Sequence, residues 1–151
     1  MASGKPIGME EKLTDMDRKL IATARKLISR RYDRDRHHIG SALITGSGKI
    51  FTGIHVEASV GRIALCAEAV AIGRMRTDCS DMVKTIVAVR SPGKGSPLGK
   101  IEIVSPCGMC RELICDYGKG AKVILREDGV VRKVDAEALL PSRFMPADHG
   151  L

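Results

Sequence analysis

The residues best suited to do chemistry begin with a pair of cysteines. Cys107 and Cys110 form a C-x-x-C motif directly after Ser105-Pro106. Because proline suits the first turn of a helix, the motif predicts a helix over 106–117 that carries both cysteines at its start. Residues three apart share a helix face, so both sulfurs can reach one ion, and a helix N-terminus favours the metal-binding thiolate. The motif alone fits either a metal site or a dithiol redox pair.

A third cysteine is followed by a carboxylate in Cys66-Ala67-Glu68, where a second helix is predicted over about 66–76. Residues two apart in a regular helix lie about 200° apart around the axis. Cys66 and Glu68 can therefore face one ion only if Cys66 is the N-cap, where the backbone is freer. Three protein ligands with an open fourth position are typical of catalytic zinc, whereas structural zinc is closed by four. The alternative for Glu68 is a solvated acid at a helix start.

The cysteine count argues against a disulfide framework. The five are Cys66, Cys79, Cys107, Cys110 and Cys115. The number is odd and no secretion signal precedes them, so we predict a cytoplasmic protein with reduced thiols. No apolar run approaches the ~20 residues of a membrane helix, and no membrane partner is expected. Cys79 and Cys115 are expected to pack, although either one as a fourth ligand would make a structural zinc site instead.

The elements that position these residues alternate between helix and strand. A capping box at Thr14–Asp17 starts a helix that ends near the charged turn at 32–36, and a short last helix is predicted over Asp135–Leu140 with Asp135 as its cap. Strand-like segments lie at 39–45, 49–56, 85–89, 101–104, 121–125 and 130–134. This order predicts an α/β fold, a three-layer α/β/α sandwich around a mixed sheet. Residues 1–12 are expected to be a disordered lead-in, and 13–146 a single domain.

The formal charge of +7 raises the question of a nucleic-acid partner. Much of this charge lies between residues 25 and 36, which would fit a nucleic-acid patch. Two aspartates interrupt the run, and two Tyr, two Phe and no Trp leave few side chains on which bases could stack. We therefore interpret the run as a solvated helix face and turn, and do not expect nucleic acid as a partner.

C-A-E followed by S-P-C-x-x-C resembles the signature of the cytidine deaminase superfamily in its three-cysteine form. The resemblance extends over residues 39–144 and includes G-x-x-F-T-G at 48–53 and L-L-P-S at 139–142. It implies a sandwich around a mixed five-stranded sheet. It also implies one Zn²⁺ per chain, held by Cys66, Cys107 and Cys110, that activates a water molecule while Glu68 transfers protons. The implied reaction releases ammonia from a cytosine-type nucleoside such as cytidine or deoxycytidine.

The resemblance also implies a substrate site and an assembly. The substrate-binding residues it implies are Phe51, His55, Glu57, Ala67, Ser105 and Phe144. His55-Val56-Glu57 stands where the family has an N-x-E motif that binds the ribose. Phe144 stands where a C-terminal Phe stacks on the base in a neighbouring subunit's pocket, which implies a homotetramer with sites at subunit interfaces.

Several positions depart from the family pattern. Ala69 stands where an Arg usually neutralises the cysteines, so Arg111 is the candidate for that electrostatic support. His37-His38 replaces Phe-Pro, and Glu112 replaces Gln. The blasticidin S deaminase branch also lacks the Arg after C-A-E, so an aminonucleoside antibiotic or another modified nucleoside is the alternative substrate. A nucleic-acid-editing deaminase, which typically carries H-A-E, and a non-catalytic zinc or dithiol protein are the remaining alternatives.

Overall fold

Helix α1 (Asp15–Arg31) begins at the predicted capping box. The computed structural model describes residues 11–97 and 99–146 of the chain. The Thr14 hydroxyl accepts the backbone N–H of Asp17, and the Asp17 carboxylate accepts the backbone N–H of Thr14. Both bonds satisfy donors that a helix start leaves without partners, which fixes where the helix begins.

A single mixed sheet forms the middle layer. Its strands are β1 (Ile39–Thr45), β2 (Ile50–Ile54), β3 (Val83–Arg90), β4 (Glu102–Val104), β5 (Lys122–Glu127) and β6 (Val130–Asp135). The order is β2-β1-β3-β5-β6, with β4 paired to β3, and only β3 and β5 run parallel. The count of five strands that the resemblance implied is wrong, because the expected strand at 101–104 joins the sheet as a sixth, β4. This strand is short and pairs with the last three residues of β3, beyond the stretch that pairs with β5.

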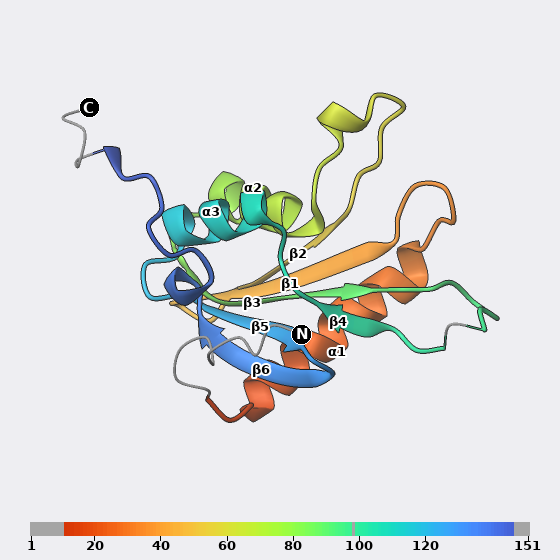
Figure 1. The fold of residues 1–151 in the computed structure, drawn as a ribbon, viewed down its shortest axis with the longest axis horizontal. Coiled ribbons are helices and arrows are strands. Elements are labelled where there is room, and N and C mark those ends of the chain that lie inside the picture. The colour runs from red at the N-terminus through yellow and green to blue at the C-terminus, as the bar shows by residue number, and fades with distance from the viewer. Residues whose placement is uncertain (1–10, 98, 147–151) are drawn as a thin grey trace.

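Helices cover both faces of the sheet (Figure 1). Helix α1 packs on one face, while α2 (Ala67–Asp78) and α3 (Gly108–Tyr117) lie side by side on the other. Two apolar clusters fill the gaps, one beneath α1 around Leu20 and Ile28, and one beneath α2 and α3 around Ile72 and Ile114. The predicted three-layer α/β/α sandwich is confirmed.

A close approach at Gly53 seats α2 against strand β2. A Cβ atom at this position would lie 2.4 Å from the carbonyl oxygen of Ala67 and 2.5 Å from the nitrogen of Ala71. No side chain fits there, which explains the second glycine of G-x-x-F-T-G. From the same helix, Arg74 donates a 2.7 Å hydrogen bond to the Thr52 carbonyl on the outer edge of β2. The approach at Gly53 fixes the start of α2, next to Cys66, and the Arg74 bond fixes a later turn of the helix to the same strand.

The end of the chain differs from the prediction. The expected helix over Asp135–Leu140 is only a 3₁₀ turn, η2 (Glu137–Leu139), and Asp135 is the last residue of β6 instead of a cap. The reason is tertiary, because the Asp135 carboxylate pairs with Lys122 at 2.8 Å across the β5–β6 ladder. A second 3₁₀ turn, η1 (Gly61–Ile63), lies in the loop before α2 and was not predicted.

The predicted lead-in, 1–12, lies largely outside the described residues. Of its described part, Glu11 forms a bridge with Lys133 on β6, through a 3.1 Å hydrogen bond from its backbone N–H. Within 11–97 and 99–146, no helix has the length and apolar character needed to cross a membrane.

Candidate active site

Two helix starts bring three sulfurs together. Cys66 is the N-cap of α2 and Cys107 the N-cap of α3, both with extended backbone, while Cys110 lies in the first turn of α3. Neither N-cap side chain hydrogen-bonds its own helix, so both thiols turn toward each other. The Sγ atoms of Cys66 and Cys107 are 3.7 Å apart, and all three sulfurs lie within 4.8 Å of one another.

This spacing fits zinc. A tetrahedral ion with Zn–S bonds of about 2.3 Å places its sulfur ligands roughly 3.8 Å apart. The predicted condition that Cys66 must be the helix cap is also met, since its φ of −65° and ψ of 149° lie outside the helical region. The three thiols can therefore hold one metal ion without rearrangement of the backbone.

Within residues 11–97 and 99–146, the protein offers three ligands to a metal ion at this site, and no fourth. Among the described residues, these three form the only cluster of three or more His, Cys, Asp or Glu side chains that could hold a metal. Cys79 and Cys115 pack against the apolar cluster beneath α2 and α3, as predicted. A structural zinc closed by a fourth cysteine is therefore contradicted, and one coordination position is left for a non-protein ligand.

Glu68 lies beside this group in apolar surroundings. It is 6% exposed, in the first turn of α2, and shares a small space with Ile86, Pro106 and Ile114. Burial raises the pKa of its carboxyl, although a hydrogen bond with the Cys110 thiol partly offsets this. A raised pKa makes the carboxyl hold a proton more readily than an ordinary carboxyl does, and a general acid and base must both accept and return one.

The thiols themselves differ in acidity. Burial raises the pKa of Cys110, and so does the neighbouring Glu68 carboxylate. Burial and a hydrogen bond with Cys107 also raise the pKa of Cys66. Burial opposes ionisation of Cys107 too, but hydrogen bonds from the Cys110 backbone N–H and from the other two thiols outweigh it and lower its pKa. Three thiolates beside a carboxylate need a cation among them, and binding the metal releases the thiol protons.

Arg111 connects the C-x-x-C segment to the end of the chain. Its Nε donates to the Pro106 carbonyl and its Nη1 to the Leu139 carbonyl, both at 3.0 Å. The side chain thus fixes the residue before Cys107 against η2. Electrostatic support of the cysteines by Arg111 stays a prediction.

The segment after β2 is fixed beside the start of α2. Val56 and Leu65 exchange backbone hydrogen bonds of 2.9 Å, which places His55 and Glu57 next to the segment that leads into Cys66. His55 Nε2 lies 3.3 Å from Glu57 Oε2. With Nε2 as the donor, Nδ1 is an acceptor, and this buried atom has no hydrogen-bond partner among the described residues.

His37 and His38 both contact His55, and the sequence assigned neither a role. The ring of His38 stacks on that of His55, with centroids 5.9 Å apart and an angle of 26° between the planes. His37 Nδ1 bonds the His55 carbonyl oxygen at 2.8 Å. The only sequence signal was their position in place of Phe-Pro.

The other predicted substrate residues lie in different environments. Ala67 is buried at the start of α2, and Phe51 is 8% exposed within the apolar cluster beneath α2 and α3. The Ser105 hydroxyl donates to the Arg126 carbonyl at 3.1 Å. Phe144 is 56% exposed beyond η2. Substrate contact by these four residues stays a prediction.

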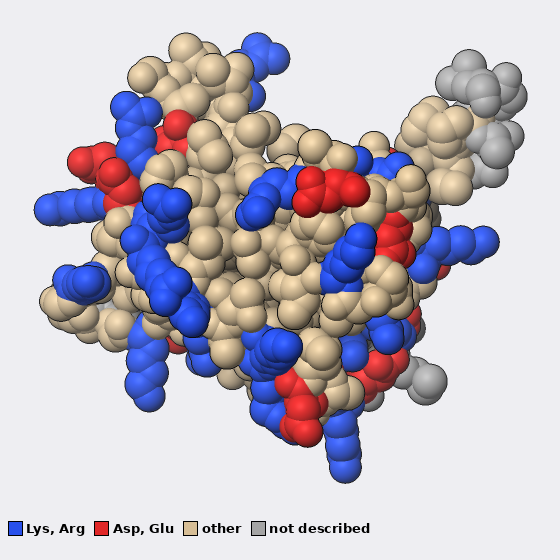
Figure 2. All heavy atoms as spheres, turned by 180° about the vertical axis from the view of Figure 1, so that it is seen from behind, with Lys and Arg blue, Asp and Glu red and all other residues tan. Residues whose placement is uncertain are grey.

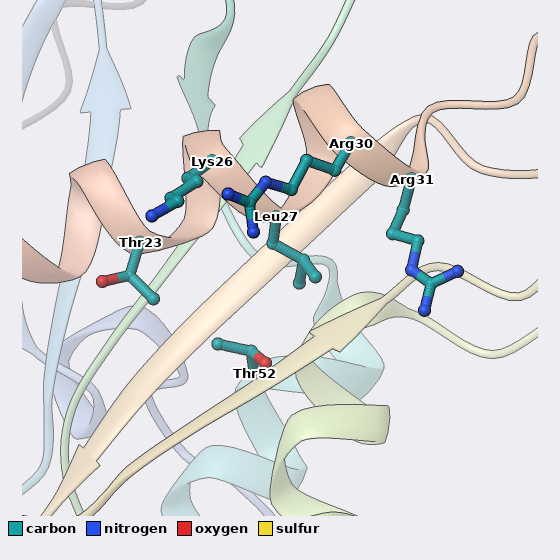
Figure 3. A pocket seen from close by; sticks show the side chains of 6 residues that line it. All are labelled: Thr23, Lys26, Leu27, Arg30, Arg31 and Thr52. Atoms are coloured by element: carbon teal, nitrogen blue, oxygen red, sulfur yellow. The ribbon is translucent and has the colours of Figure 1, made fainter.

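A separate basic cavity lies on the opposite face of the sheet. It has a volume of about 630 Å³ and lies between α1 and β2, lined by Thr23, Lys26, Leu27, Arg30, Arg31 and Thr52 (Figure 3). Thr52 pairs with Ala42, whose side chain packs beneath α1, so this cavity is on the face away from the sulfurs. Basic side chains are scattered over the rear of the molecule with acidic ones between several of them (Figure 2).

Comparison with known proteins identifies the family. Residues 14–126 match the model described as the cytidine and deoxycytidylate deaminase zinc-binding region. The chain belongs to this deaminase family. It is a zinc-dependent hydrolase acting on C–N bonds, with the cluster of Cys66, Cys107 and Cys110 able to hold the metal.

Individual relatives agree with this assignment. The chain is 39% identical over 132 residues to a blasticidin-S deaminase of Bacillus cereus, covering 87% of this chain and 94% of that one. It is 29% identical over 133 residues to a cytidine deaminase of Sporosarcina psychrophila, covering 86% and 92%. A crystal structure of the cytidine deaminase from Bacillus anthracis has the same fold, with a TM-score of 0.75 at 20% identity over 90% of this chain and 94% of that one.

Proposed function

We propose that the protein hydrolyses the exocyclic amine of a cytosine-type nucleoside, releasing ammonia and leaving a uracil-type ring. The observation that supports this best is the buried carboxyl of Glu68 beside three converging sulfurs with one open ligand position. When bound, zinc supplies Lewis-acid activation of a water molecule. Glu68 then accepts a proton from that water and delivers protons to the ring nitrogen and the departing amine. Its apolar surroundings favour the protonated form that this second step requires.

His55 and Glu57 are the proposed ligands of the sugar. Glu57 is held as a carboxylate, because a hydrogen bond from the Ala58 backbone N–H lowers its pKa, with a smaller contribution from His55. A carboxylate accepts hydrogen bonds from sugar hydroxyls, and the free Nδ1 of His55 can accept another. Because both residues lie beside the start of α2, a sugar bound by them would lie next to a base near Glu68.

The similar proteins suggest two candidate classes of substrate. Cytidine and deoxycytidine fit the cytidine deaminases, whereas the 39% identity to a blasticidin-S deaminase favours an aminonucleoside antibiotic as the second candidate. Ammonia release from cytidine, deoxycytidine, blasticidin S and a cytosine-containing oligonucleotide, measured side by side, separates them. Turnover of the oligonucleotide alone would contradict a nucleoside substrate.

The proton-transfer role of Glu68 is tested by Glu68→Gln. We expect zinc to remain at about one per chain, because the three sulfurs are untouched, and kcat to fall by about 10²–10⁴-fold, the usual contribution of general acid–base catalysis. Glu127→Gln, on the β5–β6 hairpin, is the matched control and should keep full turnover. A Glu68→Gln enzyme that stays active would show that the carboxyl does not move the proton.

The proposed assembly is a homotetramer in which neighbouring chains complete each site. Large apolar side chains are exposed around the segments that lead to the sulfurs. They are Val60 (59% exposed), Ile63 (67%), Leu65 (49%), Met109 (61%) and Phe144 (56%). Large apolar side chains left exposed on a folded chain are typical of a contact with another chain. A cytoplasmic location is proposed with it, in keeping with five cysteines that form no disulfide.

A further inference from the structure

A second cleft opens at the end of the sheet nearest the α1–β1 turn. It has a volume of about 490 Å³. Its lining includes Tyr32, Arg34, His38, Arg90, Lys100 and Glu102. They come from the turn after α1, the end of β3, and the loop and strand that follow it. Both connecting segments project from the same end of the sheet (Figure 1).

The cleft is on the same face of the sheet as the sulfurs. Val89 and Ile103 pair across β3 and β4 and pack beneath α1. Because side chains alternate along a strand, Arg90 and Glu102, and with them Val104, point to the α2–α3 side. Val104 also lines the cleft and is three residues before Cys107.

His38 connects the cleft to the proposed sugar ligands. Its ring lines the cleft and stacks on His55, which in turn pairs with Glu57. A nucleoside with its base near Glu68 and its sugar near His55 would therefore direct a substituent on the sugar toward this cleft.

The cleft carries a surplus of positive charge. Arg34, Arg90 and Lys100 are exposed, and none of them has an ion-pair partner within residues 11–97 and 99–146. The only acid among the lining residues, Glu102, already pairs with Arg126. Cations gathered in a concave site attract an anion more strongly than the same charges on a convex surface, because the walls focus the field.

We propose that this cleft is an anion subsite for a carboxylate or phosphate carried by the sugar of the substrate. The proposal rests on the proposed function and narrows its substrate class to nucleosides with a negatively charged substituent at the 5′ end. Arg34 and Arg90 can each offer paired N–H donors to such a group, and Lys100 a point charge.

Calorimetry on the zinc-loaded protein tests this with three ligands that share one uracil ring. Uridine has no anion, uridine 5′-monophosphate carries a phosphate, and uridine 5′-carboxylate carries a carboxylate. We expect at least one anionic ligand to bind about tenfold or more tightly than uridine, as one or two charge-assisted hydrogen bonds would give. Comparison of the two anionic ligands tells which of the two groups the cleft prefers.

Two double variants then test whether the tighter binding of the anionic ligands depends on the cations of the cleft. In Arg90→Gln/Lys100→Gln, the ratio of anionic to neutral affinity should fall to near one. Arg25→Gln/Lys84→Gln removes the same charge from exposed positions on α1 and at the far end of β3, and should keep the ratio.

The outcomes separate the two claims. Equal affinity for all three ligands would overturn the subsite, and so would a ratio that survives in the first variant or falls equally in the control. If no ligand binds and no cytosine nucleoside is deaminated, the proposed function itself fails, and the subsite fails with it.

Discussion

Five cysteines share one chain, and their positions on the helices separate the three that can hold zinc from the two that pack. Cys66 and Cys107 occupy N-caps and Cys110 the next turn, whereas Cys115, one turn further along α3, is 9% exposed within the apolar cluster. A helix end leaves backbone and side chain free to aim at an ion, and a helix interior does not.

The two kinds of cysteine should therefore respond differently to substitution. We expect Cys66→Ser to weaken zinc binding by more than the 10–100-fold typical of losing an outer-shell partner, because it removes a ligand outright. Cys115→Ala should keep about one zinc per chain and lose only about 1 kcal/mol of stability. Competition with a coloured chelator gives the zinc affinity and urea unfolding the stability. Equal zinc loss in both variants would contradict the separation.

At the scale of elements, Asp81 holds the β1–β2 hairpin to the segment that leads into β3. Its carboxylate accepts the backbone N–H of Ser47 at 2.9 Å and that of Met82 at 2.8 Å. The hydrogen bond from the Ser47 side chain, followed by bonds from Thr45 and from these N–H groups, holds the pKa of Asp81 well below its usual range. The folded state thus favours the carboxylate over the acid.

A pH dependence follows from the sign of this shift. Because the pKa of Asp81 is lower in the folded than in the unfolded state, its contribution is complete above the unfolded value of about 4 and is lost as the pH falls below it. We expect Asp81→Asn to unfold at lower urea than the wild type at pH 7, and the gap between the midpoints to narrow at pH 3. Asp78→Asn, exposed at the end of α2, is the control. A gap that stays constant with pH would exclude the charge of Asp81 as the cause.

The same scale shows which elements the sequence can predict. The Thr14 capping box and the two cysteine-capped helices are local patterns, completed within about one turn, and the structure confirms them. The place of the sixth strand in the sheet and the 3₁₀ turn at Glu137 depend on partners that are distant in the sequence. The segment at 101–104 was expected to be a strand, but a sheet of five strands left no place for it. β4 is defined by its pairing with β3, and Asp135 is held by Lys122.

The candidate site also has features that local sequence patterns predict and features that only the folded chain shows. The spacing within each motif predicted which residues could share an ion, and the family resemblance joined the two motifs. The 3.7 Å approach of Cys66 to Cys107 depends on α2 and α3 lying on one face of the sheet, which no local pattern specifies. The stacking of His38 on His55 also joins separate elements, so the cleft beside them could not be predicted from either segment alone.

Across the whole molecule, a buried ion pair joins the first helix to the last strand. Lys133 Nζ lies 3.0 Å from Asp17 Oδ2, with 10% and 3% of the side chains exposed, and the residues are 116 positions apart. Burial opposes ionisation of Asp17, but hydrogen bonds from Thr14 and Lys133 outweigh it and lower its pKa. The pair ties the α1 layer to β6.

Removal of one partner should be costly. We expect Lys133→Met to lower the free energy of unfolding by about 3–5 kcal/mol, because it leaves the Asp17 carboxylate buried with fewer partners. Asp17→Asn/Lys133→Met should lose less than the sum of the single changes. Urea unfolding of the four proteins gives the coupling energy, and strictly additive losses would mean that the pair contributes nothing as a pair.

The assembly decides whether the site is complete in one chain. The loop around η1 carries Ile63, 67% exposed, and Figure 1 shows this loop projecting from the α2–α3 side of the molecule.

If this surface is a subunit contact, Ile63→Asp should convert an assembly of four 16.3 kDa chains into smaller species, because a charge buried at an interface is strongly unfavourable. Turnover should fall with assembly while each chain keeps its three zinc ligands. Val130→Asp is the matched control, since Val130 is also exposed (48%) but lies on the β5–β6 hairpin and not in the loop around η1. Sedimentation velocity and zinc analysis of both variants decide the matter, since a wild type that sediments as a single chain with full activity would mean that one chain alone makes a working site.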